Sequence, residues 1–161
     1  PYIFHASLRD NIKFYTPNTD DVTVESAIER AGLSSLVREM PDGLDTMIGE
    51  SGRQLSGGQA QRVALARMLL DPQRKVLLFD EPTAHLDIET EVELKQTMAP
   101  ILANHLVFFA THRLHWLDQM DYVLVIANGQ IVETGEPKIL LADENSALNH
   151  LRHELYRGKL V

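Results

Sequence analysis

Two short apolar segments, separated by a stretch of helix length, constrain the fold most. Residues 75–79 and 106–110 are strand-sized and almost wholly apolar, as expected of strands buried on both faces of a parallel sheet. Between them, Asp87 can cap a helix that carries several glutamates near its start and ends near Pro100. Strand, helix and strand form a βαβ unit, which predicts an α/β fold with a mainly parallel sheet.

The segment before this unit is predicted to consist mainly of small helices. Asp20 or Asp21 can cap a helix whose apolar positions recur at helical spacing and which ends at Gly32. The three helices expected here cover residues 7–12, 24–31 and 35–39.

After the βαβ unit, the sequence predicts a hairpin and then helices. Asn128 and Gly129 are a strong hairpin signal between two expected strands, residues 122–127 and 130–133. The final helices are expected over residues 137–141 and 146–156.

Composition excludes several classes of protein. The chain has 161 residues, 44% of them hydrophobic, and a formal net charge of −8, which argues against an extended nucleic-acid surface. It has no cysteine, so thiolate metal sites and cysteine nucleophiles are excluded. No apolar run reaches the length of about 18 residues that a membrane helix needs, and no secretory signal opens the chain. Because the first residue is Pro1, we expect a piece of a longer protein.

Residues 55–59, which read Leu-Ser-Gly-Gly-Gln, predict the start of a helix that runs over about 56–70. Ser56 and Gln59 have the spacing of a capping box, and Gly57 and Gly58 would let another surface approach the backbone closely. Such a helix start exposes N–H groups and the positive end of the helix dipole, which attract phosphate. The alternative is an ordinary capped helix with a flexible entry.

Acidic side chains follow the first apolar strand. Asp80 suits a Mg²⁺ site, and Glu81 could polarise a water for attack; the alternative is two solvated acids at a strand end. His112 follows the next strand, so a parallel sheet would place it on the same rim as Glu81. The remaining histidines are interpreted as structural: His5, His85, His105, His115, His150 and His153.

Together, these motifs resemble those of ATP-binding-cassette (ABC) ATPases. Residues 55–59 are similar to the signature motif, and residues 76–81 to the Walker B motif with its catalytic glutamate. Residues 84–87 resemble the D-loop, although Ala84 replaces the serine of many members, so a hydroxyl contact is lost. Residues 111–113 resemble the switch histidine. All four motifs agree with the family in order and spacing.

The resemblance implies a role for each motif residue. Glu81 would be the general base, His112 would sense the γ-phosphate, and Asp80 would bind Mg²⁺. ATP would be held on the P-loop of a second nucleotide-binding domain, across a head-to-tail dimer. The residues expected to contact that ATP are Ser56, Gly57, Gly58, Gln59 and Asp87.

Further segments resemble exporter-type members of the family. Residues 49–52 lie where exporters carry a loop that touches the membrane domain, and residues 3–12 resemble the segment that follows their Q-loop. Residues 81–87 and the Gly135-Glu136 region are similar to the cysteine/glutathione exporters of cytochrome bd assembly, which are heterodimers. The implied partners are a second nucleotide-binding domain, in a homo- or heterodimer, and a transmembrane domain. The implied location is the cytoplasmic face of the cell membrane.

One family motif is missing from the sequence. No G-x-x-x-x-G-K-[ST] occurs, so residues 1–161 are expected to form an incomplete P-loop NTPase domain without its Walker A part. About residues 1–70 would form the helical subdomain with the signature motif, and about 71–161 the Walker B, switch and C-terminal part. We expect the isolated chain to bind ATP weakly, to hydrolyse none, and to self-associate through its bared sheet.

Three functions compete at this point. The first is the nucleotide-binding domain of an exporter, an ATPase coupled to transport, and residues 3–12 and 49–52 favour it. The second is a soluble ABC ATPase that acts on DNA or ribosomes, but no basic surface is evident and no nucleic-acid partner is expected. The third is a folded module without enzymatic activity.

Overall fold

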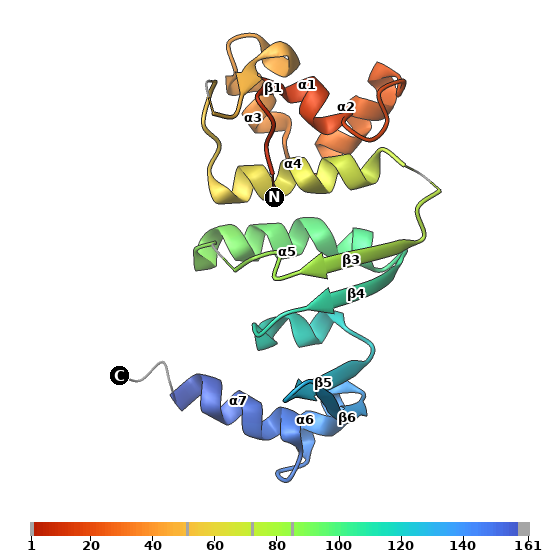
Figure 1. Ribbon diagram of the computed structural model, residues 1–161, viewed down its shortest axis with the longest axis vertical. Coiled ribbons are helices and arrows are strands. Elements are labelled where there is room, and N and C mark those ends of the chain that lie inside the picture. Colours follow the sequence, from red (N-terminus) through yellow and green to blue (C-terminus); the bar gives the residue numbers. More distant parts are fainter. Residues whose placement is uncertain (1, 51, 72, 85, 158–161) are drawn as a thin grey trace. The chain divides into compact units, whose positions relative to one another are not determined.

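A computed structural model describes residues 2–50, 52–71, 73–84 and 86–157. Ser51 and His85, to which the sequence assigned a loop position and a structural role, lie outside the described residues. The chain forms two compact units, Pro1–Ala110 and Thr111–Val161. Figure 1 shows the helices of the first unit in red to green and the second unit in teal to blue. The sequence also predicts a boundary near residue 70, between the helical subdomain with the signature motif and the Walker B part. That boundary is defined by the motifs and stays a prediction.

The first part of the chain is helical, as expected. It contains α1 (Leu8–Ile12), α2 (Asp21–Arg30) and α3 (Ser34–Glu39), followed by a short 3-10 helix, η1 (Gly43–Asp45). The predicted cap of α2 is Asp20, whose side chain accepts a hydrogen bond from the Thr23 amide, and Gly32 (φ 67°) follows the helix in the left-handed conformation.

The helix of the glycine motif, α4 (Gly57–Leu69), organises this unit. Both α1 and α2 pack against it, as Figure 1 also shows. Most of the interface is apolar and closed to solvent, since Leu8, Ile12, Val24 and Val63 are fully buried. Burial of these side chains holds α4 in a fixed environment of small helices.

A small antiparallel strand pair was not predicted. β1 (Ala6–Ser7) pairs with β2 (Met47–Ile48), which brings the N-terminal segment against the loop that precedes α4. Each strand has two residues, too few to show a period of alternation in the sequence. Gly49 (φ 97°) lies directly against the backbone of Phe4, so a side chain at this position would collide with it.

The predicted βαβ unit is present. β3 (Val76–Asp80) and β4 (Leu106–Ala110) are parallel, in a register that pairs Leu78 with Phe108, and α5 (Ile88–Leu102) connects them. The helix continues past Pro100 to Leu102, because a proline in the last turn removes only one hydrogen bond. The other two strand pairs of the described residues are antiparallel, and outside the strands a single parallel bridge joins Ile48 and Arg53.

The expectation that these two strands are buried on both faces is wrong for this chain. Leu77 is buried, but the alternating residues on the other face are exposed: Val76 by 46%, Leu78 by 74%, Leu106 by 60% and Phe108 by 53%. We call these four residues the bare sheet face. The physical reason is that the rest of the first unit, to which both strands belong, covers only one face of this two-stranded sheet.

The second unit contains the predicted hairpin, β5 (Val123–Ala127) and β6 (Gln130–Gly135). Asn128 and Gly129 both have positive φ, as the two-residue turn requires. A 3-10 helix that was not predicted, η2 (Leu114–Gln119), buries Trp116. Two helices close the chain, α6 (Pro137–Ala142) and α7 (Ala147–Arg157).

Among the described residues, no helix combines the length and the apolarity required to cross a membrane.

Candidate functional site

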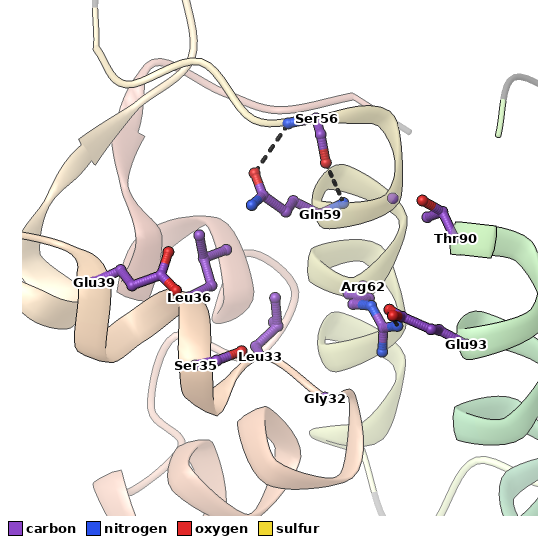
Figure 2. A pocket seen from close by; sticks show the side chains of 11 residues that line it. Gly32, Leu33, Ser35, Leu36, Glu39, Ser56, Gln59, Arg62, Thr90 and Glu93 are labelled. Carbon is purple, nitrogen blue, oxygen red and sulfur yellow. Dashed lines mark hydrogen bonds and ion pairs between the residues drawn. The ribbon is translucent and has the colours of Figure 1, made fainter. Parts of the chain in front are cut away.

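The start of α4 has the predicted capping box. The Ser56 hydroxyl accepts a hydrogen bond from the Gln59 amide at 3.2 Å, and the Gln59 side chain accepts one from the Ser56 amide at 3.0 Å (Figure 2). These two bonds fix the helix start and use two of its backbone donors. The amides of Gly57 and Gly58 find no acceptor among the described residues. Because Gly57 is exposed, its amide remains available to a ligand.

Charge and exposure at this helix start favour an anion. Ser56 and Gly57 are exposed, and no acidic residue lies in the first turn of α4. Free amides and an uncompensated positive helix end together attract phosphate or carboxylate groups. This helix start is therefore suited to an anion, and the phosphate contact stays a prediction.

The second glycine of the motif has a structural role as well. Gly58 is buried, and a side chain at this position would collide with the methyl group of Thr90 on α5. Glycine thus allows the starts of α4 and α5 to approach each other closely. The sequence predicted that another surface would approach these glycines, and at Gly58 that surface is α5 of the same chain. Sequence reasoning missed Thr90, although its spacing from Asp87 suits a helix cap.

A cavity of about 280 Å³ lies beside the start of α4, between this helix, α3 and α5 (Figure 2). Arg62 crosses it from α4, donating to the carboxylate of Glu93 at 3.2 Å and to the hydroxyl of Thr97 at 2.9 Å. The sequence did not identify this cavity. Its lining is Gly32, Leu33, Ser35, Leu36, Glu39, Ser56, Gly58, Gln59, Arg62, Thr90 and Glu93.

The two predicted acids lie at the carboxyl end of β3. Asp80 is the last residue of the strand, exposed, and in register with Ala110 on β4. Glu81 leaves the strand with a φ of 43°, and its amide donates to the carbonyl of Ala110 at 2.9 Å. Left-handed backbone is uncommon for residues other than glycine and is often found at functional sites, because it costs energy that the surrounding structure must supply.

Asp87 caps α5, as the sequence predicted. Its carboxylate accepts hydrogen bonds from the Thr90 amide at 2.9 Å and from the Thr90 hydroxyl at 2.8 Å. The bond from the amide, and then that from the hydroxyl, hold the pKa of Asp87 below its usual value, since both favour the charged form. A contact between Asp87 and ATP stays a prediction.

The remaining predicted site residue, His112, lies in the second unit. It is exposed and follows the end of β4 by two residues. The neighbouring Arg113 amide donates to the Thr111 hydroxyl at 3.0 Å. His105, in contrast, is partly buried with its Nδ1 at 2.7 Å from the Ile101 carbonyl, which agrees with the structural role expected for it.

The candidate ligands for a divalent metal are acidic and histidine side chains. No group of three or more acidic or histidine side chains among the described residues could hold a metal ion. Asp80 can supply one carboxylate, which suits Mg²⁺, because this ion is often held by one or two carboxylates together with substrate phosphates and waters.

Comparisons with known proteins agree with these motifs. The family described as ABC transporter matches residues 2–84. The glutathione/L-cysteine transport system ATP-binding/permease protein CydC of Bacillus subtilis is 54% identical over 141 residues, which are 88% of this chain and 25% of that protein. The Toxin RTX-I translocation ATP-binding protein of Actinobacillus pleuropneumoniae is 39% identical over 153 residues, 95% of this chain and 21% of that protein. This chain therefore spans about a quarter of the length of such relatives.

A solved structure shows the same fold. The structure of a bacterial Atm1-family ABC exporter with ATP bound superposes with a TM-score of 0.82 and 31% sequence identity, over 95% of this chain and 26% of that one. The fold is thus that of part of an ABC ATPase domain, as the motifs indicated. The capped glycine motif, the acidic end of β3 and the family match lead to one conclusion: the chain belongs to the ABC transporter family.

Proposed function

We propose that this chain is part of a nucleotide-binding domain that binds and hydrolyses ATP to drive export across a membrane. The observation that carries the proposal is the start of α4, where a capping box holds the helix and leaves the amides of Gly57 and Gly58 free. Two relatives named as toxin or hemolysin translocation ATP-binding proteins, and the similar structure named as an ABC exporter, support export as the direction of transport. The net charge of −8 gives no support to a nucleic-acid substrate.

Each motif residue then has its own role. Ser56, Gly57, Gly58 and Gln59 contact the phosphates of an ATP molecule held by the P-loop of a second nucleotide-binding domain, and Asp87 lies beside it. Asp80 contributes a ligand to Mg²⁺, which neutralises phosphate charge when bound. Glu81 orients and deprotonates the attacking water, and His112 senses the γ-phosphate. Two such domains, identical or paralogous, work with a transmembrane domain at the cytoplasmic face of the membrane.

The transported substrate is proposed from similarity. The relatives from Bacillus subtilis and Escherichia coli, 54% and 40% identical, are both named as glutathione/L-cysteine transport proteins. We propose a small thiol compound of this class as the exported substrate.

The test is ATP hydrolysis by the full-length protein in lipid. The change Glu81→Gln is expected to lower kcat by about 100-fold or more, with KM for Mg·ATP within about threefold, because a general base acts in the chemical step and not in binding. Glu25→Gln, an exposed glutamate on α2, is the matched control and is expected to leave the rate unchanged. A wild-type rate in Glu81→Gln would contradict the assignment.

The isolated chain is expected to behave differently. Without a G-x-x-x-x-G-K-[ST] sequence it has no phosphate cradle, so calorimetry should show no micromolar affinity for Mg·ATP. The bare sheet face exposes four large apolar side chains, which favours self-association. Light scattering should show a mass that rises with concentration, and a monomer at all concentrations would contradict this proposal.

A further inference from the structure

Arg67 is a buried cation that the motifs do not use. It lies on α4 and is only 8% exposed, although arginine is almost never buried unless it is paired. Among the described residues no carboxylate pairs with it. Its guanidinium instead donates to the Asn11 carbonyl through Nε, to Asn11 Oδ1 at 2.9 Å, and to the Tyr2 carbonyl at 2.7 Å.

The partner of this cation, Asn11, extends the same network. Asn11 is fully buried on α1. Its Oδ1 also accepts from the Phe4 amide at 2.9 Å, and its Nδ2 donates to the carbonyls of Phe4 at 2.9 Å and Ser7 at 3.0 Å. The guanidinium lies over the Phe4 ring, 5.4 Å from its centroid. We call these groups the Arg67–Asn11 cluster.

The cluster fixes residues 2–12 to α4 in one orientation. A guanidinium has a planar fork of donors, so its three bonds to Asn11 and Tyr2 define a direction that apolar packing alone does not. Lysine could keep the charge but not the fork. Loss of the bonds would leave buried donors and acceptors unpaired, so a second arrangement of these segments is disfavoured.

The two segments joined in this way have different surfaces. One end of α4 is the anion-attracting start at Gly57. Residues 2–15 carry a series of aromatic rings in contact: Tyr2 and Phe4 meet edge to face with centroids 4.8 Å apart, and Phe4 and Phe14 are stacked with centroids 4.1 Å apart. Tyr2 is 73% exposed and Phe14 46% exposed, so this aromatic surface is open to a partner.

We propose that Arg67 is a positioning residue that makes the start of α4 and residues 2–12 move as one body. A change at the phosphate-binding end is then transmitted to the aromatic segment through the Arg67–Asn11 cluster. The inference rests on the proposed function, because the start of α4 must contact ATP. Arg62, on the same helix, differs from Arg67 because it bonds to Glu93 and Thr97 on α5 and not to residues 2–12.

Hydrogen–deuterium exchange with and without Mg·ATP tests the transmission in the full-length protein carrying Glu81→Gln, which blocks hydrolysis. In this parent protein, Mg·ATP is expected to slow exchange both at residues 56–60 and at residues 2–12. The change Arg67→Lys is expected to reduce the slowing at residues 2–12 by about fivefold or more, while residues 56–60 still respond. Arg62→Lys is the matched control and is expected to keep both responses.

If Arg67→Lys does not fold, a second variant tests the same inference. Asn11→Asp retains the oxygen that accepts from Arg67 and from the Phe4 amide, but it places a second oxygen against the carbonyls of Phe4 and Ser7. The two bonds that Nδ2 donates to those carbonyls are therefore lost. The response of residues 2–12 to Mg·ATP is expected to fall in this variant too.

Two results would overturn the inference while the proposed function stands. In the first, residues 2–12 respond to Mg·ATP as strongly in Arg67→Lys and Asn11→Asp as in the parent. In the second, Arg62→Lys loses the response equally, which would indicate general loosening of α4. No response at residues 56–60 in the parent would instead overturn the proposed ATP contact, and the inference with it.

Discussion

The helices α4 and α5 begin in similar ways, yet their starts differ in charge. In α4 the Ser56 side chain accepts from the Gln59 amide, and in α5 the Asp87 side chain accepts from the Thr90 amide. Each helix therefore satisfies one backbone donor with a side chain three residues earlier. A side-chain cap alone does not distinguish a binding site from an ordinary helix start.

The first turns make the difference. α5 has Glu89 and Glu91 in its first turn in addition to the Asp87 carboxylate, so its own side chains compensate the positive end of the helix. α4 has two glycines there and no acid, and its positive end is left for an anion from outside. The charges near a cap, and not the cap itself, therefore distinguish a helix start that can attract an anion from one that cannot.

The largest effect is expected where the two helix starts meet. The change Gly58→Ala adds a methyl group that collides with Thr90 and forces the two starts apart, so we expect ATP hydrolysis by the full-length protein to fall by about 100-fold. Helix propensity acts in the opposite direction, since alanine is favoured over glycine by about 1 kcal/mol. Activity and helix stability should therefore separate.

A double variant decides whether that collision is the cause. Thr90→Ser removes the methyl group but keeps the hydroxyl that donates to Asp87 at 2.8 Å. Adding Thr90→Ser to Gly58→Ala should restore a large part of the activity, and Thr90→Ser alone should change little. No restoration would mean that the two helix starts do not need their close approach.

The second prediction concerns a variant in which the start of α4 carries a negative charge, as the start of α5 does. Ser56→Asp keeps a favourable cap but places a carboxylate where phosphate is expected, so KM for Mg·ATP should rise by roughly tenfold or more through like-charge repulsion. Ser56→Asn is the control, because asparagine also caps well but is neutral. Equal KM values in the two variants would show that the charge at this helix start is unimportant.

Much of this comparison could be predicted from the sequence, because caps and glycines act locally. The capping box of Ser56 and Gln59, the cap at Asp87 and the order of strand, helix and strand all depend on residues a few positions apart. The turn at Asn128 and Gly129 was predictable for the same reason.

Features that depend on distant residues could not be predicted. Thr90 touches Gly58, and Arg67 bonds to Asn11 across 56 positions of sequence. No local period encodes either contact. The apolar strand 76–79 indicated burial on both faces, but which face is covered depends on the elements that pack against it, and in this chain only one face is covered. Sequence patterns reveal what a segment could bury, not what lies beside it.

A smaller effect is expected when the cap of α4 is removed without any added charge. Ser56→Ala leaves the Gln59 amide without its side-chain acceptor, so the free energy of unfolding of the chain should fall by about 1 kcal/mol. Urea denaturation measures this change. Ser35→Ala, at a position on α3 that caps nothing, is the control, and an equal loss in both would contradict a capping role for Ser56.

The smallest effect is a difference in pH dependence between the two caps, since only that of α5 titrates. The pKa of Asp87 is lowered in the folded chain by its bonds from Thr90, so its contribution to stability is present above the ordinary value of 3.8 and is lost as the pH falls through the lower, folded pKa. Asp87→Ser provides a cap that does not titrate, and comparing it with the wild type cancels the similar lowering at Asp20. The wild type should melt at a higher temperature than Asp87→Ser at pH 7, by a margin that shrinks below about pH 4.

The control is Ser56→Ala, whose melting temperature should lie below that of the wild type by the same amount at both pH values, because a hydroxyl cap is not ionised. A margin for Asp87→Ser that stays constant down to pH 3 would mean that the charge of the carboxylate contributes nothing to the start of α5, and that α4 and α5 differ in composition alone.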